Sequence, residues 1–285
     1  RTRPKAIYVG ANDGMLHAFA AADGVESWAY VPALLIPKLY QLADKNYPSK
    51  HQFFVDGAPV MGDICASNCT AKGTPVWKTI LVGGFNRGGR GYYALDITDP
   101  DSPRALWEFS NDKLGYSYGN PVISKLKDGT WVVIVSSGYN NVNPGDGDGR
   151  LFIINADSGE LIRSITTDSG STGTPSGLSR ISAWANYPDS NNTAQRVYGG
   201  DLLGNLWRFD INGDIPAGSA SASYDAQRLA TLTDSGGNAQ PIRGEQEKIG
   251  RGLAARHLRR GIDMRGEILP QPAQLQRLIQ TRQRR

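Results

Sequence analysis

The sequence predicts an all-β fold, a β-propeller built from four-stranded blades. Three observations lead to it: a strand–turn–strand unit recurs along the chain, the turns between strands are rich in Gly, Asp, Asn and Pro, and each unit is flanked by further short strands. Repeats of four antiparallel strands with no helix between them are typical of propellers. The 34 Gly residues fit a chain with many tight turns.

The clearest copies of the unit lie at the two ends of the repeat region. Residues 7–19 and 197–210 both read as an apolar pair, Gly, a turn closed by Gly, and alternating apolar residues ending in Phe. Residues 80–96 and 132–155 have the same order with longer turns. We expect the third strands of the four units to end at Phe19, Leu95, Ile154 and Phe209.

Each unit extends to four strands. A Gly- and Pro-containing strand precedes it, as in residues 56–60 and 119–123, and an Asp/Ser/Gly turn with another short apolar strand follows it, as in residues 158–162. Gly and Pro suit the innermost strand because backbones approach closely near a propeller axis. A β-sandwich is the structural alternative, but it does not predict the same four-strand order returning four times.

A short helical insertion interrupts the pattern near residues 33–45. Leu35, Leu39 and Leu42 recur at helical spacing and would share one face. We expect this face to pack on the propeller, with a groove for a partner as the alternative role.

The propeller is expected to be incomplete. Only six residues precede Ile7, so the first unit lacks an inner strand, and residues 240–242 resemble the inner strand of a blade that does not follow. Propellers close their rings to protect edge strands. We therefore assign residues 1–242 to a partial propeller domain and residues 243–285 to a separate tail.

Charge separates these two parts. The tail holds ten Arg and one Lys against four acidic residues, a net charge of +7, whereas residues 1–242 hold 20 basic and 23 acidic residues, a net charge of −3. The body therefore has no nucleic-acid footprint. The Arg- and Gln-rich tail is interpreted as a non-native or disordered ending, and the alternative is a basic arm for nucleic acid or anionic lipid.

The two cysteines, Cys65 and Cys69, are four residues apart. We predict a disulfide in a small loop at a hairpin tip, which implies an oxidising compartment. Two free thiols in a turn are the alternative. The sequence contains no export signal and no apolar run long enough for a membrane helix.

Several of these segments resemble one known family. They are residues 8–19, 54–60, 88–96 and 199–210, and they occur in the same order as in the C-terminal propeller of the PilY/PilC-type proteins of type IV pili. The likeness covers about residues 5–242 and stops after Ile242.

The resemblance implies a non-enzymatic pilus biogenesis and adhesion factor that supports pilus extension, surface attachment and twitching motility. Its partners would be pilin or other pilus components, and a host or surface receptor. It would act outside the cell, at the surface or pilus tip, after passing through the periplasm. The alternatives are a periplasmic scaffold propeller for outer-membrane assembly and a fragment of a quinoprotein dehydrogenase, which normally needs an adjacent Cys-Cys pair that is absent here.

The resemblance also implies a calcium loop just before residues 196–201. Here the loop is residues 187–195, with Asp189 as its one acid and Gln195 where the family has a closing acid. Calcium binds six to eight oxygens, so this loop would bind it weakly at best, through Asp189, Asn191 and Thr193. A plain Asn/Ser turn is the alternative.

Two further turns could carry chemistry. Residues 143–149 contain two carboxylates but lack the closing acid of a calcium loop, so we predict an ordinary turn. Residues 83–91 are Gly-rich but lie between two strands and lack the Lys-Ser/Thr of a phosphate loop. There, Arg87 and Arg90 would present a small basic patch to a partner.

Overall fold

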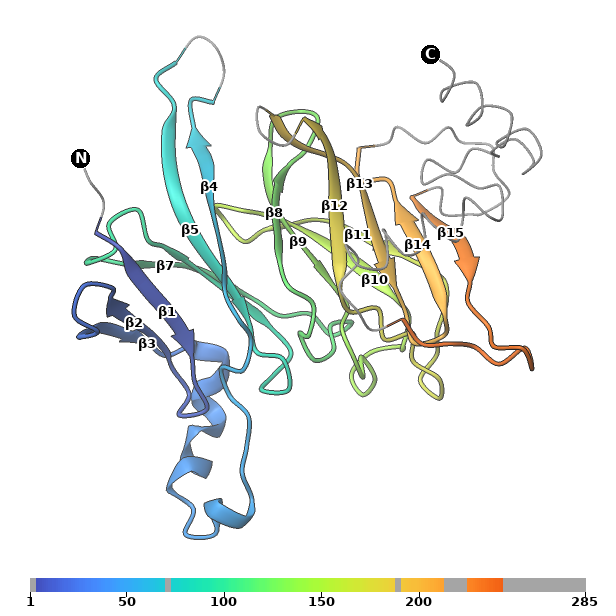
Figure 1. Ribbon diagram of the computed structural model, residues 1–285, viewed down its shortest axis with the longest axis horizontal. Helices are drawn as coiled ribbons and strands as arrows, with labels where there is room; N and C mark the ends of the chain where they lie inside the picture. Colours follow the sequence, from blue (N-terminus) through green and yellow to red (C-terminus); the bar gives the residue numbers. More distant parts are fainter. Residues whose placement is uncertain (1–3, 70–72, 188–190, 213–224, 243–285) are drawn as a thin grey trace, which may run out of the picture. The chain divides into compact units, whose positions relative to one another are not determined.

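The computed structural model describes residues 4–69, 73–187, 191–212 and 225–242. The predicted tail, 243–285, lies outside the described residues. The described chain is mostly β, with two short helical segments between the third and fourth strands (Figure 1). This agrees with the predicted fold class.

Four antiparallel strand groups follow one another along the sequence (Figure 1). The first blade has three strands, β1 (Ala6–Gly10), β2 (Leu16–Ala20) and β3 (Glu26–Tyr30). The second has four, β4 (Val60–Ser67), β5 (Val76–Gly84), β6 (Tyr92–Asp96) and β7 (Arg104–Phe109). The third has β8 (Val122–Lys125), β9 (Trp131–Ser136), β10 (Arg150–Asn155) and β11 (Leu161–Thr166). The fourth has β12 (Ile181–Tyr187), β13 (Asn191–Gly200), β14 (Asn205–Phe209) and β15 (Ala226–Thr231).

The blades repeat one register. In the first blade Ala6 pairs with Ala20, and in the second Ile80 pairs with Asp96 at the corresponding position of the β5–β6 pair. The strands β2, β6, β10 and β14 correspond to the predicted third strands of the four units. They end at or within one residue of the predicted positions. A single parallel bridge, Thr193 to Lys125, joins the third and fourth blades through β13 and β8, which the sequence did not predict.

Three apolar clusters fill the spaces between blades. The cluster between the second and third blades contains Ile64, Val82 and Val133, all fully buried. The cluster between the third and fourth is built on Val132, Val197 and their neighbours. Because each blade hides one face against the next, most side chains of the middle strands are inaccessible to water.

Two tryptophan indoles each donate a hydrogen bond to the neighbouring blade. Trp28 Nε1 donates to the Pro100 carbonyl oxygen of the second blade at 2.7 Å, and Trp107 Nε1 donates to that of Ala156 in the third at 3.0 Å. The two tryptophans occupy equivalent positions, opposite Ala18 and Ala94. An indole buried between blades thus has its one donor satisfied.

Glycine allows the connections between blades to cross the ends of β1 and β5. A Cβ on Gly10 would lie 2.7 Å from the Val55 carbonyl oxygen, and one on Gly84 would lie 2.9 Å from that of Ser117. Val55 and Ser117 belong to the segments that lead into the second and third blades. Only a residue without a side chain permits this approach at both positions.

The last of these connections differs from the prediction. Residues 240–242 form no strand; instead the Ile242 N–H donates to the Asp201 carbonyl at 2.9 Å and the Ile242 side chain is buried. Val55 makes the same contact with Ala11 before β4. The segment is therefore a connection that leads out of the fourth blade rather than an inner strand.

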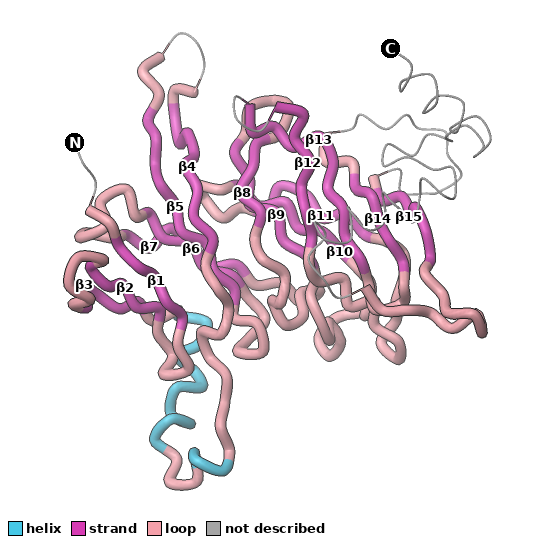
Figure 2. The backbone as a smooth tube through the Cα atoms, in the orientation of Figure 1, coloured by secondary structure: helices cyan, strands magenta, loops and turns pink. Residues whose placement is uncertain are grey.

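The predicted insertion is helical, but its helices are of the 3₁₀ type. They are η1 (Ala33–Ala43) and η2 (Tyr47–Ser49), drawn in cyan in Figure 2. Pro37 lies inside η1 and has no N–H to donate, which disfavours a regular α-helix there. Leu35 is buried, and Leu39 and Leu42 pack against the cluster between the first two blades, as their spacing predicted.

Candidate interaction surfaces

A carboxylate from the second blade fixes the start of the insertion. Glu108 on β7 accepts hydrogen bonds from the backbone N–H groups of Ala33 at 2.5 Å and Leu34 at 2.8 Å. The same carboxylate accepts the Tyr30 hydroxyl at 2.8 Å. The first N–H groups of a helix have no partners within the helix, so a carboxylate there satisfies donors and favourably opposes the helix dipole. Burial, together with Glu108, raises the pKa of Tyr30 well above its ordinary value.

A lysine fixes the middle of η1. The Lys38 ammonium donates to the carbonyl oxygens of Phe53, at 3.2 Å, and Gly88, and it lies 4.9 Å from the Phe54 ring centre. Burial lowers the pKa of Lys38. Glu108 and Lys38 together hold the insertion to the second blade and to the connection before it.

The anchored insertion also carries exposed apolar residues. Leu34 is 40% exposed, Ile36 57% and Tyr40 73%. We refer to these three residues as the insertion face. An apolar surface on an element that is already fixed loses little conformational entropy when a partner binds.

The predicted basic patch is reduced to one arginine. Arg90 donates to three backbone carbonyls of residues 140–144 at 2.8 to 2.9 Å, and its guanidinium lies 5.9 Å from the Tyr116 ring centre. It therefore ties the β9–β10 turn to the second blade. Arg87 remains exposed and lies 5.2 Å from the Phe53 ring centre.

The two carboxylates of the acidic turn at 143–149 have partners in the surrounding structure. Asp146 pairs with Lys113 at 3.1 Å and with Arg150 at 2.5 Å, and Asp148 accepts the Ser169 N–H at 2.8 Å. Although burial opposes it, the Asp148 N–H and these two cations keep the pKa of Asp146 below its ordinary value.

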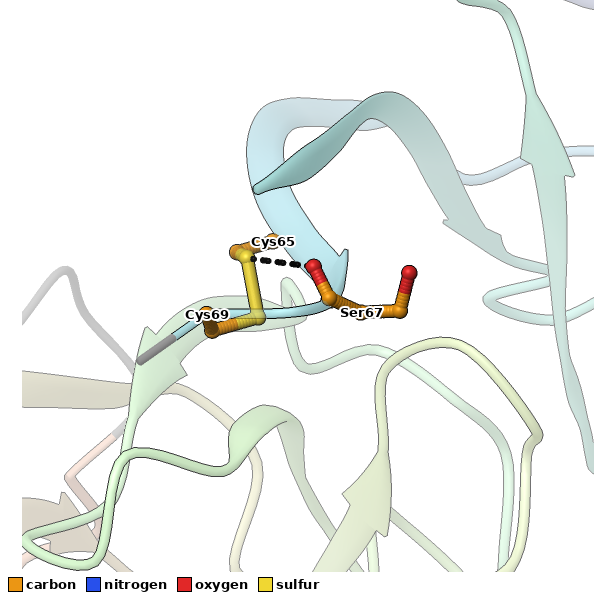
Figure 3. The surroundings of a disulfide bond; sticks show 3 residues. All are labelled: Cys65, Ser67 and Cys69. Atoms are coloured by element: carbon orange, nitrogen blue, oxygen red, sulfur yellow. Dashed lines mark hydrogen bonds between the residues drawn. A yellow bond between two sulfur atoms is a disulfide. The ribbon is translucent and has the colours of Figure 1, made fainter. Parts of the chain in front are cut away.

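The disulfide between Cys65 and Cys69 is present (Figure 3). The two Cα atoms are 5.8 Å apart, and Asn68 has a positive φ of 56° that lets the chain turn back toward β4. Trp77 on β5 pairs with Cys65 in the β4–β5 ladder and is 53% exposed, and its ring centre lies 5.9 Å from that of Trp131 on β9. The disulfide-closed hairpin thus presents one exposed aromatic side chain, Trp77.

The described part of the predicted calcium loop is strand. Tyr187 pairs with Asn191 in the β12–β13 ladder, so three residues separate the two strands. The Thr193 hydroxyl donates to the Asn191 side-chain oxygen at 2.6 Å. These two neutral oxygens are hydrogen-bonded to each other. Two such oxygens alone cannot supply the six to eight ligands that calcium prefers. Asp189 lies outside the described residues.

In the ranges that the structure describes, no three His, Cys, Asp or Glu side chains gather as a metal site would require. Within the same ranges, no helix has the length and apolarity needed to cross a membrane.

Comparison with known sequences places this geometry in context. A family model described as the PilY1 β-propeller domain matches residues 1–243. The chain is 38% identical over 261 residues to the type IV pilus biogenesis factor PilY1 of Pseudomonas aeruginosa PAO1, covering 85% of this chain and 21% of that protein. A PilY1 homologue of Xylella fastidiosa is 37% identical over 243 residues, covering 84% of this chain and 18% of that protein.

A solved structure gives the same result. The crystal structure of the P. aeruginosa PilY1 C-terminal domain superposes with a TM-score of 0.64 at 35% identity, covering 86% of this chain and 49% of that domain. The chain thus spans about half of the solved domain and about a fifth of the length of the curated relatives.

Proposed function

The chain belongs to the PilY1 β-propeller family, and from that premise we propose that it acts as a non-enzymatic module of a type IV pilus biogenesis factor. Its task would be to bind pilin or another pilus component and so to support pilus extension, surface attachment and twitching motility. It would work outside the cell, at the pilus. A host or surface receptor would be a further partner of the same module.

The observation that carries this proposal is the insertion face. A helical segment is fixed to the second blade and to the connection before it by Glu108 and Lys38, and it presents Leu34, Ile36 and Tyr40 to solvent. Exposed tyrosine and large aliphatic side chains on a rigid support are the kind of group that dominates protein interfaces. A catalytic role would instead need a pocket with a positioned acid, base or nucleophile.

The test is a genetic one in the source bacterium. The gene that encodes this chain is deleted and then restored as wild type or with Ile36→Glu and Tyr40→Glu together. We expect the deletion to reduce surface pili, twitching zones and attachment. The double variant should restore these readouts only partly, because two charges on the insertion face prevent an apolar partner from docking.

A matched control separates docking from general surface change. Val25 is 62% exposed in the β2–β3 turn, away from the insertion, and Val25→Glu should restore function fully at equal protein abundance. Normal pili and motility in the deletion strain would refute the proposed function. Full restoration by the double variant would refute the role of the insertion face.

A further inference from the structure

Arg87 presents unused hydrogen-bond donors at the protein surface. Its guanidinium lies 5.2 Å from the Phe53 ring centre, and within the described residues no oxygen accepts a hydrogen bond from it. Arg90, three residues later, differs because its guanidinium donates to three backbone carbonyls. A guanidinium held against a ring in this way keeps its planar set of donors available to a ligand.

Three rings lead from the insertion to Arg87. The ring centres of Tyr47 and His51 are 5.7 Å apart, and those of His51 and Phe53 are 5.2 Å apart with the rings edge to face. These residues lie where the chain returns from η2 toward the blades (Figure 2). His51 is exposed and the other two rings are half-buried, so all three reach the surface.

Two tyrosines continue the series on the other side of Arg87. Asn86 forms a β-bridge with Ser117, which brings Arg87 next to the segment that carries Tyr118. The half-buried rings of Tyr118 and Tyr139 have their centres 5.2 Å apart. We call the five rings on the two sides of the guanidinium the aromatic row: Tyr47, His51, Phe53, Tyr118 and Tyr139.

The charges along the aromatic row are of both signs. Burial and the Asp56 carboxylate raise the pKa of Tyr118, and the Arg87 guanidinium opposes this rise, so both charges lie near its hydroxyl. Arg87 and Lys50 are exposed, and within the described part of the chain neither forms an ion pair. The row can therefore attract an anionic group at these two cations and accept a hydroxyl donor at Asp56.

The chemistry of the aromatic row differs from that of the insertion face. None of its side chains is a large aliphatic group, and most of its rings carry a hydroxyl or a ring nitrogen. Such rings suit a ligand that is apolar on one side and polar at its rim. A sugar ring has this character, with a C–H face and hydroxyl groups at its edge. A uronic acid adds a carboxylate, which a guanidinium binds through two parallel hydrogen bonds.

We propose that the aromatic row and Arg87 bind an acidic polysaccharide composed of uronic acids. Its sugar rings pack against the side chains of the row, Arg87 binds a carboxylate, and Asp56 accepts a sugar hydroxyl. This surface uses none of the three residues of the insertion face. It is therefore a second binding surface, beyond the protein docking proposed above.

The experiment is calorimetric titration of the full chain with a tetrasaccharide of galacturonic acid. A galactose tetrasaccharide of the same linkage, which lacks the carboxylates, is the matched ligand. We expect saturable binding of the acidic sugar and binding of the neutral sugar that is weaker by about tenfold or more, because the charge-assisted hydrogen bonds are lost. Absence of saturable binding of the acidic sugar, or equal binding of the two sugars, would overturn the proposal.

Two arginine variants locate the site. Arg87→Ser should weaken binding of the acidic sugar by about tenfold or more. Arg228→Ser also removes one positive charge from an exposed arginine, on β15, and should change binding less than about twofold. Both variants keep the basic residues 243–285, so attraction of the sugar to that segment is the same in each. Equal weakening by the two substitutions would show that net charge alone is responsible and would refute the site.

A charged peptide separates sugar recognition from simple anion binding. Tetraglutamate carries four side-chain carboxylates without sugar rings, and it should bind the unaltered chain more weakly than the acidic tetrasaccharide by about tenfold or more. Equally tight binding of tetraglutamate would show an acidic protein segment as the occupant and would refute the proposal. The three ligands are compared on the unaltered chain, so their order decides the matter even if Arg87→Ser fails to fold.

Discussion

Removing the Glu108 carboxylate is expected to loosen the helical insertion and destabilise the second blade. Glu108→Ala deletes two hydrogen bonds to the start of η1 and one to Tyr30. Loss of a helix cap costs about 1 kcal/mol. Loss of a hydrogen bond to a charged group costs about 1.5 kcal/mol or more. We therefore expect the free energy of unfolding to fall by about 2 to 3 kcal/mol.

Urea unfolding followed by tryptophan fluorescence measures this change. With a slope of about 2 to 3 kcal/mol per molar urea, the midpoint should fall by about 1 M. Glu108→Gln retains one acceptor oxygen and should lose less than half as much. Amide hydrogen exchange at Ala33 and Leu34 should accelerate in the Ala variant, because their N–H groups lose their acceptor.

Glu160→Ala is the matched control. Glu160 is an exposed glutamate on the β10–β11 turn, and surface substitutions of this kind usually change stability by less than about 0.5 kcal/mol. The reasoning fails if Glu108→Ala stays within that range of the wild type and leaves exchange at Ala33 and Leu34 unaltered.

Three further predictions concern charge, the disulfide and calcium. The Glu26 carboxylate, opposed by burial and assisted by Asp13, raises the pKa of His17 above 6.5. The stabilisation from this pairing is therefore complete below pH 6.5 and is lost as the pH rises through the folded-state pKa. His17→Gln should remove about 0.5 kcal/mol at pH 5.5 and nothing at pH 8.5 in urea unfolding, and an equal loss at both pH values would contradict the assignment. Cys65→Ser opens a five-residue loop and should lower the free energy of unfolding by about 2 kcal/mol, a loss that reductant should reproduce in the wild type but not in the variant. Calorimetric titration with millimolar calcium should give no saturable heat, with or without Asp189→Ala; a saturable signal that disappears in the variant would establish the calcium site.

The repeat was readable from the sequence because propeller blades are built from local pairings. A strand, a Gly-closed turn and a second strand lie within about 15 residues, and their alternation fixes which side chains are buried. The fold class, the positions where the third strands end and the apolar face of the insertion all followed from such short-range patterns. The family resemblance rested on the same segments.

The contacts that define the candidate surfaces could not be predicted from short-range sequence patterns. Glu108 caps a helix that begins 75 residues earlier, and Arg90 binds carbonyls about 50 residues later. Arg90 was predicted to be part of an exposed patch because an arginine in a Gly-rich turn gives no sign of a distant acceptor. The segment 240–242 was interpreted as a strand because its Gly- and Pro-containing neighbourhood resembles an entry to a blade. Its hydrogen-bond partner, the Asp201 carbonyl, lies about 40 residues earlier in the chain.

The sequence by itself thus determined the all-β repeat, the family and the two cysteines that pair, since each depends on residues close together in the chain. The tertiary structure alone decided which polar groups hold the insertion and which arginine remains exposed. Those features depend on how neighbouring blades pack, and packing brings together residues whose separation along the chain leaves no periodic signal.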